Sequence, residues 1–431
     1  MKQLYRYALW IGITALALIL IIWAMGILNF IPPLAVLAAV SIALGFGALK
    51  TLRTYQYTAW ILVAILCGML YPSAFLSWGD LDLRNPWLIL IIVQMVMFGM
   101  GTQMSLKDFS GLRTMGKGVL IGLICQFTIM PIIGFLLTKV FDFEPEIAAG
   151  VILIGSCSSG LASNVMVYLA KANLTLSITL TAMATLVAPL MTTFLMKMLA
   201  GTYVEINFLD MCFQIIKIVL VPIGAALIFD GMRKDFGSFR KVINSISVLS
   251  IIWLLGMLFG LWSYFSSTFS EQTMEVIALI NFLFGAMLFG NVYYRIFKII
   301  PNIQNVMPLI SMFGIIYFTT VTTAASRDNL LAIGLFLLLA SIIHNTLGYT
   351  LGYWLSRLLE LDKDSSRTIA LEVGMQNGGM ASGLAGVMGK LATLGLAAAV
   401  FSPWMNISGS LLANYWRKRP VNRMKKDTTG K

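Results

Sequence analysis

The sequence predicts an all-α polytopic membrane protein with about fourteen transmembrane helices. Of its 431 residues, 59% are hydrophobic and 11% are charged, a balance that soluble domains do not show. Apolar runs of about 20 residues, the length that a helix needs to cross the hydrocarbon core, recur from end to end. Lipid offers no partner for backbone polar groups, so each run is expected to be a helix that bonds its own backbone.

The apolar runs give the order of the expected helices. They lie at 8–29, 32–50, 57–76, 86–104, 117–138, 146–171, 175–199, 211–230, 245–267, 273–294, 303–325, 329–354, 366–390 and 394–416. The first run is long enough to span and has no small-residue cleavage site after it, so we expect it to remain as an anchor.

The net charge of +12 raises the possibility of a nucleic-acid partner, which the placement of the charge disfavours. Basic residues follow every second predicted helix, for example Lys107, Arg113, Arg233 and Lys234. Basic loops remain in the cytoplasm, so we expect both termini to be cytoplasmic and the chain to lie in a plasma or inner membrane. The basic tail 418–431 is expected to contact anionic membrane lipid rather than nucleic acid.

The four cysteines lie in or beside apolar runs and show no metal-type spacing. They are Cys67, Cys125, Cys157 and Cys212. We expect free thiols in packing positions, and no cofactor.

Two similar strings occur far apart in the chain: "GSCSSGLASN" begins at Gly155 and "GMQNGGMASG" begins at Gly374. They fall on the sixth and thirteenth predicted helices. These helices are seven membrane crossings apart, and because seven is an odd number they run through the membrane in opposite directions. Inverted repeats with a glycine-interrupted helix in each half are typical of secondary transporters, whose broken helices meet at the membrane midplane. The alternative is an ordinary close helix contact, which two matching strings in inverted orientation disfavour.

Glu372 is the only carboxylate that we place well inside an apolar run, just before the second string. Such a group is costly to bury and is functional by default. No basic residue in the same stretch is placed to pair with it, whereas Gln376 and Asn377 offer amide oxygens. This environment favours a hard monovalent cation.

Further oxygens come from Ser163 and Asn164 at the end of the first string, and from Gln126 in the fifth helix. Ser177 and Thr181 are four residues apart, so their hydroxyls share one helix face. Hydrogen bonding between helices is an equally good explanation for these two hydroxyls.

The residues also resemble the bile acid:sodium symporter family. The resemblance rests on "GLASNVMVYLAKANLTLSITLTAMATL", "EVGMQNGGMASGLA" and "NISGSLLANYW", and it covers roughly 57–240 and 306–417. It implies a ten-helix inverted-repeat transporter with a panel domain, a core domain and two broken, crossing helices. Two helices within 1–56 and a transmembrane hairpin within 241–305 are additions to that plan.

The resemblance also implies two sodium sites and a substrate cavity. Site one would use Ser163, Asn164, Ser177, Thr181 and Glu372; site two would use Gln126, Glu372 and Gln376 with the backbone oxygens of Val373 and Met375; Asn377 and Asn406 would face the substrate. The family's Pro-Gly-Gly-Thr is replaced by Ser158, Ser159, Gly160 and Leu161, and a frequent His by Met405. These changes put bile acid itself in doubt as the substrate.

Two other polar residues in apolar runs have plainer explanations. His344 is expected to be a packed, neutral imidazole rather than a proton relay, because no second titratable group is visible nearby. Lys217 is expected to snorkel or to pair with a loop acid rather than to contact substrate.

Together these features predict a sodium-coupled importer of a small organic anion, not an enzyme, that works by alternating access. Two Na+ beside one Glu372 would leave about one excess positive charge, which an anionic substrate would balance. The alternative is a proton-coupled carrier or cation/proton exchanger in which Glu372 carries the proton. The sequence does not predict an oligomeric state.

Overall fold

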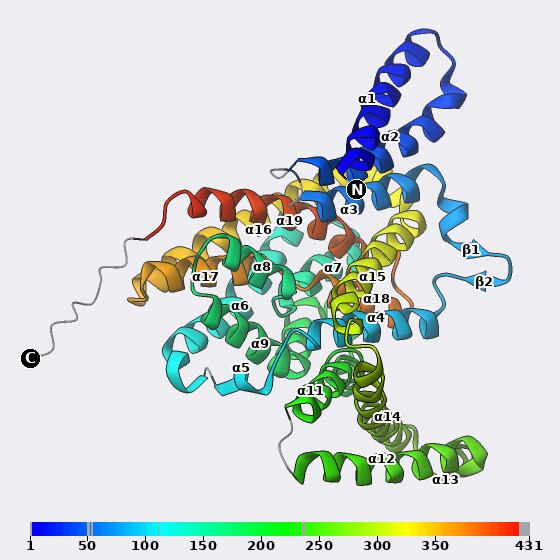
Figure 1. The fold of residues 1–431 in the computed structure, drawn as a ribbon, viewed down its shortest axis with the longest axis vertical. Helices are drawn as coiled ribbons and strands as arrows, with labels where there is room; N and C mark the ends of the chain where they lie inside the picture. Colours follow the sequence, from blue (N-terminus) through cyan, green and yellow to red (C-terminus); the bar gives the residue numbers. More distant parts are fainter. Residues whose placement is uncertain (1, 50–51, 53–54, 111, 235–237, 422–431) are drawn as a thin grey trace, which may run out of the picture.

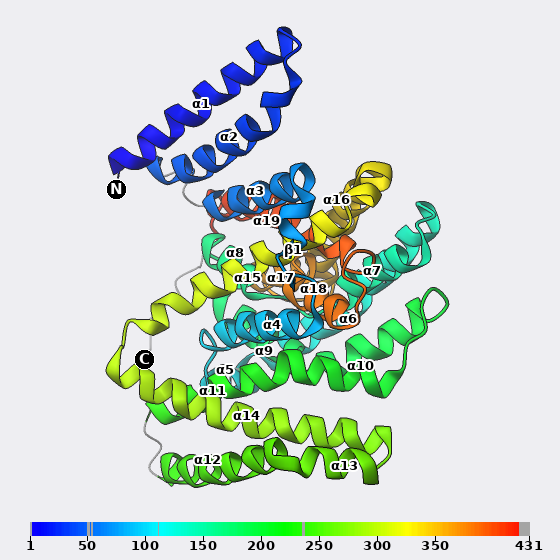
Figure 2. The same ribbon diagram turned by 90° about the vertical axis from the view of Figure 1, so that its right-hand side faces the viewer.

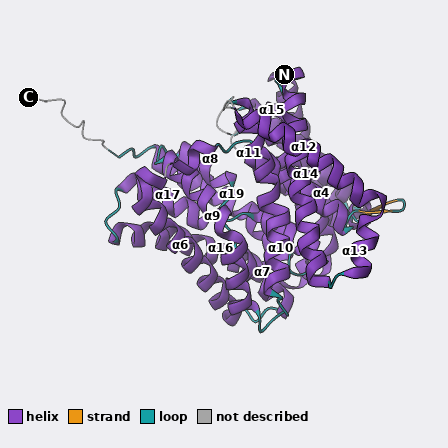
Figure 3. Ribbon diagram, turned by 90° about the horizontal axis from the view of Figure 1, so that it is seen from below, coloured by secondary structure: helices purple, strands orange, loops and turns teal. Residues whose placement is uncertain are grey.

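The computed structural model describes residues 2–49, 52, 55–110, 112–234 and 238–421, and within them it is almost wholly helical (Figure 3). Among these residues, ten helices are long and apolar enough to cross a membrane. The prediction of an all-α, multi-pass membrane protein is therefore confirmed. The predicted basic tail lies outside the described residues from position 422 onward.

The chain runs through the following helices and strands. They are α1 (Lys2–Ala24), η1 (Leu28–Phe30), α2 (Ile31–Gly45), η2 (Phe46–Ala48), α3 (Gln56–Leu70), η4 (Pro72–Phe75), β1 (Ser77–Trp78), β2 (Leu81–Asp82), α4 (Pro86–Gly101), α5 (Leu106–Ser110), α6 (Leu112–Val140), α7 (Pro145–Ser156), α8 (Leu161–Leu169), α9 (Leu174–Leu195), η5 (Met196–Ala200), α10 (Phe208–Ile215), η6 (Ile216–Leu220), α11 (Val221–Arg233), α12 (Ser238–Gly256), η7 (Met257–Leu261), α13 (Trp262–Thr268), α14 (Glu271–Ile299), α15 (Ile303–Ala325), α16 (Arg327–Leu358), α17 (Lys363–Gly374), α18 (Gly378–Val387) and α19 (Leu396–Arg417).

Helix is found in every predicted segment, with two notable differences in extent. The segment predicted at 57–76 ends as α3 at Leu70, because Pro72 disfavours helical geometry at the residue before it, and Tyr71 has a φ of −131°. The segment predicted at 245–267 bends at η7, where Gly260 has a φ of 126°, a value that glycine adopts without steric cost.

One layer of the molecule is a row of helices in the order α3, α15, α4, α11, α14 and α12, each packed on the next (Figure 2). Glycines allow the close approach. A Cβ on Gly68 of α3 would lie 2.8 Å from the Thr320 carbonyl oxygen of α15, and one on Gly290 of α14 would lie 2.6 Å from the Ala225 oxygen of α11. Small residues at such contacts are the usual means of helix packing in membranes.

A second group of helices, α6, α7, α9, α16, α17 and α19, packs together beside that row (Figure 2). Here too a glycine lies directly against the backbone of the neighbouring helix. A Cβ on Gly155 of α7 would lie 2.7 Å from the Met130 carbonyl oxygen of α6. The two groups meet where α19 contacts α3 and α15, and where α18, which packs on α7 and α19 of the second group, contacts α4 and α15.

Two helical hairpins lie at opposite ends of the molecule (Figure 1). The α1–α2 hairpin packs on α3 through α2 and leaves large apolar side chains such as Trp10 and Trp23 exposed. The hairpin of α12, α13 and α14 packs on α11. Edge-to-face ring contacts of Tyr293 with Phe98 and Phe229 join α14 to α4 and α11.

His344, Lys217 and the four cysteines were predicted to have structural rather than transport roles. His344 is buried, and its Nε2 lies 2.8 Å from the Met130 carbonyl oxygen, so the packing role is confirmed. Lys217 is buried and pairs with Glu275 at 2.5 Å; this acid lies in α14 rather than in a loop. All four cysteines are free, as expected.

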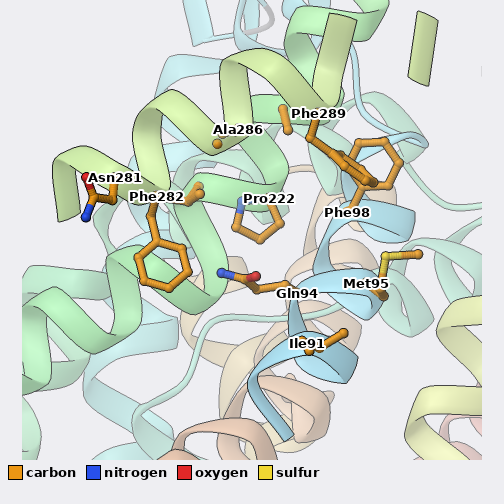
Figure 4. Close-up of a pocket in the computed structure, with 12 residues that line it drawn as sticks. Ile91, Gln94, Met95, Phe98, Pro222, Asn281, Phe282, Ala286 and Phe289 are labelled. Atoms are coloured by element: carbon orange, nitrogen blue, oxygen red, sulfur yellow. The ribbon is translucent and has the colours of Figure 1, made fainter. Parts of the chain in front are cut away.

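A cavity of about 370 Å³ lies between α4, α11 and α14 (Figure 4). Its lining is mainly apolar and includes Phe98 and Phe289, while the Gln94 amide donates to the Lys217 carbonyl at 3.0 Å. Different side chains of α4, Val93 and Met97, face α18. The cavity is therefore separate from the broken helices.

Candidate functional site

Two predicted helices are interrupted at the two similar strings. After α7 the chain is extended, with ψ of 161° at Cys157 and φ, ψ of −124°, 179° at Gly160, before α8 begins. After α17, Met375 has φ, ψ of −110°, 102°, and Asn377 caps the start of α18 by accepting from the Met380 N–H at 3.0 Å. Each interruption leaves backbone groups without helical partners, which a membrane interior cannot satisfy.

The two interruptions satisfy these groups by crossing each other. Ser159 and Gln376 form an antiparallel backbone bridge, and the Asn377 N–H donates to the Ser158 carbonyl at 2.9 Å. The two chain segments therefore run in opposite directions where they meet, and each supplies backbone hydrogen-bond partners to the other.

Glu372 lies fully buried in the last turns of α17 and is surrounded by hydroxyl groups. Its carboxylate accepts from Ser159 Oγ at 2.6 Å, from Ser177 Oγ at 2.5 Å and from Thr181 Oγ1 at 2.7 Å. In the described part of the chain, none of the ion pairs includes Glu372. A buried carboxylate without a basic partner calls for a proton or a cation.

The oxygen atoms around Glu372 make more close contacts with one another than there are hydroxyl protons to form hydrogen bonds. Ser177 Oγ and Thr181 Oγ1 also lie 2.6 Å and 3.2 Å from Asn164 Oδ1. Ser159 Oγ lies 3.4 Å from Thr181 Oγ1, so the cluster has six oxygen–oxygen contacts for three hydroxyl protons. When Glu372 is ionised and Asn164 presents its Oδ1 to the two hydroxyls, at least three of these contacts bring lone pairs together, and a hard cation among the oxygens would relieve that repulsion.

Of the residues predicted for the first ion site, the structure gathers Asn164, Ser177, Thr181 and Glu372 around these contacts. Ser163 is buried beside them, but its hydroxyl donates to the Gly160 carbonyl at 2.7 Å. That bond takes the proton of Ser163 and leaves its lone pairs available.

Three of the residues predicted for the second site, Gln126, Gln376 and Val373, are joined by a chain of hydrogen bonds. Gln126 Nε2 donates to Gln376 Oε1 at 2.8 Å and to the Cys157 carbonyl at 2.9 Å, and Gln376 Nε2 donates to the Val373 carbonyl at 2.6 Å. Gln126 Oε1 is buried and has no hydrogen-bond partner. An orphaned buried acceptor is uncommon and calls for a missing partner, for which a cation is suited.

Asn377 and Asn406, the predicted substrate residues, are both buried. Asn406 Nδ2 donates to the Ser402 carbonyl at 2.8 Å. A Cβ on Gly378, the neighbour of Asn377, would lie 1.9 Å from Ser402 Oγ. Both asparagines therefore border the contact between α18 and α19.

The residue that the sequence prediction missed is Ser159, whose hydroxyl contacts Glu372 directly. Its signal was the departure from the family's Pro-Gly-Gly-Thr string, which puts a hydroxyl where the family often has glycine. Among the described residues there is no cluster of three or more His, Cys, Asp or Glu. A site with one carboxylate and several neutral oxygens suits a monovalent rather than a divalent cation.

A helical chain that crosses the membrane many times and buries one carboxylate where two interrupted helices cross falls in the class of secondary membrane transporters. Comparison with known proteins makes the assignment specific. The chain belongs to the Sodium Bile acid symporter family, whose sequence profile matches residues 90–267. The matched residues contain the first interruption, while Glu372 lies beyond them.

Curated relatives support the same family. The chain is 32% identical over 361 residues to the "Uncharacterized sodium-dependent transporter YocS" of Bacillus subtilis, covering 84% of this chain and 90% of the relative. It is 28% identical to the "Probable sodium/metabolite cotransporter BASS1, chloroplastic" of Arabidopsis thaliana, covering 84% and 73%. Against the human "Ileal sodium/bile acid cotransporter" the identity is 27%, covering 67% and 65%. The family membership supports sodium-coupled symport.

Proposed function

We propose that this protein is a sodium:organic anion symporter that works by alternating access. The observation that carries the proposal is the fully buried Glu372 carboxylate, which accepts from three hydroxyl groups and belongs to none of the ion pairs of the described residues. A sodium ion there would bind these oxygens and neutralise the only carboxylate of the cluster.

The first sodium would bind among Ser163, Asn164, Ser177, Thr181 and Glu372. The second would bind near Gln126 and Gln376, where the unpartnered Gln126 Oε1 offers a ligand. Glu372 would serve both sites, with the backbone oxygens of Val373 and Met375 completing the second. In that arrangement the amide of Gln376 would turn away from the Val373 carbonyl when the ion enters.

Charge balance supports an anionic substrate. Two Na+ beside one carboxylate leave about one positive charge, and the helix N-termini of α8 and α18, which both begin at the crossing, add positive potential. Asn377 and Asn406 would then contact the anion. We propose a bile-acid-like molecule or another small carboxylate or sulfonate; the printed names of two relatives mention a metabolite and bile acid.

Alternating access would follow from relative movement of the two helix groups. The row containing α3, α4, α11 and α15 would be the panel, and α6 to α9 with α16 to α19 would be the core, two inverted halves on either side of the crossing. The helices within 1–56 and the hairpin within 241–305 are additions to the edges of this plan. Both termini would be cytoplasmic, as the basic loops indicate.

Uptake into proteoliposomes tests the proposal. A thermal-shift screen of organic anions with and without Na+ first finds a substrate, because a ligand that binds the native state raises apparent stability. Uptake of that anion is then measured under an inward Na+ gradient with pH equal on both sides. Accumulation that needs Na+ supports symport, whereas accumulation that follows a proton gradient and ignores Na+ overturns it in favour of the proton-coupled alternative.

A further inference from the structure

Asn345 of α16 is a buried side chain outside both predicted ion sites. It is fully buried, and its Nδ2 donates to the Gly374 carbonyl at 2.7 Å. In a continuous helix that carbonyl would accept from the N–H of residue 378. Here the Gly378 N–H bonds to the Gln376 carbonyl instead. Asn345 therefore replaces the helical bond that the second interruption removes.

The other end of the same amide reaches α19. Asn345 Oδ1 accepts from Ser408 Oγ at 2.6 Å, and Ser408 Oγ lies 3.2 Å from the Tyr349 hydroxyl. Ser408 also lies only two residues beyond Asn406, which is proposed to face the substrate. One side chain thus joins the end of α17 to the helix that borders the substrate.

Packing around this link leaves little freedom. A Cβ on Gly374 would lie 2.2 Å from the Tyr349 ring, and one on Gly348 would lie 3.0 Å from Gly374 Cα. On the other side, a Cβ on Gly409 of α19 would lie 2.8 Å from Met375 Sδ. The last peptide of α17 is therefore confined by α16 and α19 as well as by the Asn345 bond.

The Gly374 carbonyl stands between the carbonyls of Val373 and Met375, the proposed backbone ligands of the second sodium. Peptide units are planar, so fixing the direction of the middle carbonyl restricts the torsions on both sides of it. We propose that Asn345 is a positioning residue that aims these backbone oxygens at the second sodium and transmits movement of α19 to them. This inference rests on the proposed function.

The test compares Asn345→Ala with Asn291→Ala. Asn291 of α14 is equally buried and donates to Asn244 and Ser247 across the α12–α14 hairpin, far from the interruptions in sequence and packing. The thermal midpoint of the purified full-length protein is measured against Na+ concentration, at constant ionic strength maintained with choline. In the absence of Na+, both variants should have a lower thermal midpoint than the wild type, since each substitution removes buried hydrogen bonds.

Only Asn345→Ala should change the response to sodium. We expect its half-maximal Na+ concentration to rise about tenfold and its Hill coefficient to fall toward one, because the second ion loses its preformed ligands. Asn291→Ala should stay within about twofold of wild type. Ser408→Ala, which keeps the Asn345 side chain and removes only its link to α19, should raise the half-maximal concentration about threefold and provides the test if Asn345→Ala does not fold.

The outcomes separate this inference from the proposed function. A wild-type protein that does not respond to Na+ overturns both. A wild-type protein that responds, with Asn345→Ala and Ser408→Ala giving the same half-maximal concentration and Hill coefficient, overturns the positioning role alone.

Discussion

Ser159 Oγ donates to Glu372 Oε2 at 2.6 Å across 213 positions of sequence. The contact joins the first interrupted helix to the second at the point where their backbones also pair. The same carboxylate also accepts from two hydroxyls of α9, those of Ser177 and Thr181. The crossing of the two interruptions is therefore the candidate ion site.

The hydroxyl of Ser159 should matter for sodium binding. Ser159→Ala removes an oxygen that contacts Glu372, and hydrogen bonds to charged groups contribute about 1.5–3 kcal/mol. We expect the half-maximal Na+ concentration for thermal stabilisation to rise about tenfold. Ser158→Ala is the matched control, because the Ser158 hydroxyl lies 3.5 Å from Thr185 and does not contact Glu372. Equal responses of the two variants would contradict a role for Ser159 in the site.

The Lys217–Glu275 pair should stabilise the hairpin rather than bind substrate. Glu275→Gln leaves a buried lysine without its counter-charge. We expect a loss of about 2 kcal/mol, below the 3–5 kcal/mol of fully buried pairs, because a third of the Glu275 side chain is exposed. The double variant Lys217→Met, Glu275→Leu should regain most of that stability. The thermal midpoints of the wild type, the single variant and the double variant measure these changes in stability.

Lys117→Met provides the control for the ion pair, since Lys117 and Glu360 are largely exposed and 3.9 Å apart. Its effect should be within about 0.5 kcal/mol. A change in substrate affinity in Glu275→Gln, with an unchanged thermal midpoint, would instead place Lys217 in the transport pathway.

Asn377 should have two separable roles. Its side chain caps α18, and loss of such a cap costs about 1 kcal/mol. Asn377→Ala should therefore lower both the thermal midpoint and substrate affinity, whereas Asn377→Ser should keep the cap and lose only affinity. Substrate-induced thermal shifts, measured in saturating Na+, distinguish the two. Wild-type affinity in Asn377→Ser would remove this residue from the substrate cavity.

The glycine that opens the first string should be needed for packing. Gly155→Ala would force a Cβ to within 2.7 Å of the Met130 oxygen, and overpacking of this kind costs about 1–3 kcal/mol. Gly224→Ala in α11 is the control, because its Cβ would meet nothing within 4 Å and alanine favours a helix by about 0.5–1 kcal/mol. A stable Gly155→Ala with unchanged thermal midpoint would show that α6 and α7 can separate.

The sequence predicted the parts of the site that depend on local pattern. Glu372 stands out because it is a carboxylate in an apolar run, and the two interruptions stand out because glycine and amide residues replace helix formers. The spacing of Ser177 and Thr181 predicted one shared helix face, and both contact Glu372.

Other features depend on tertiary geometry, which spacing does not determine. The contact of Ser159 with Glu372 arises only when the interruptions cross, and the bond from the Ser163 hydroxyl to the Gly160 carbonyl forms only in the first turn of α8. In the sequence, Asn345 is an ordinary polar residue of an apolar helix. Its role depends on the Gly374 carbonyl, which has no helical partner and accepts from Asn345 only in the folded structure. The division into 57–240 and 306–417 with two additions stays a prediction.

Binding of radioactive Na+ to the purified protein, wild type against Glu372→Gln, tests the central claim most directly. A charge pair about 4 Å apart in a protein environment interacts by about 4 kcal/mol, so losing the carboxylate should weaken binding about a thousandfold. We predict saturable binding in the wild type and none at the same concentrations in folded Glu372→Gln. Equal saturable binding in both would contradict the assignment of Glu372 as the sodium ligand.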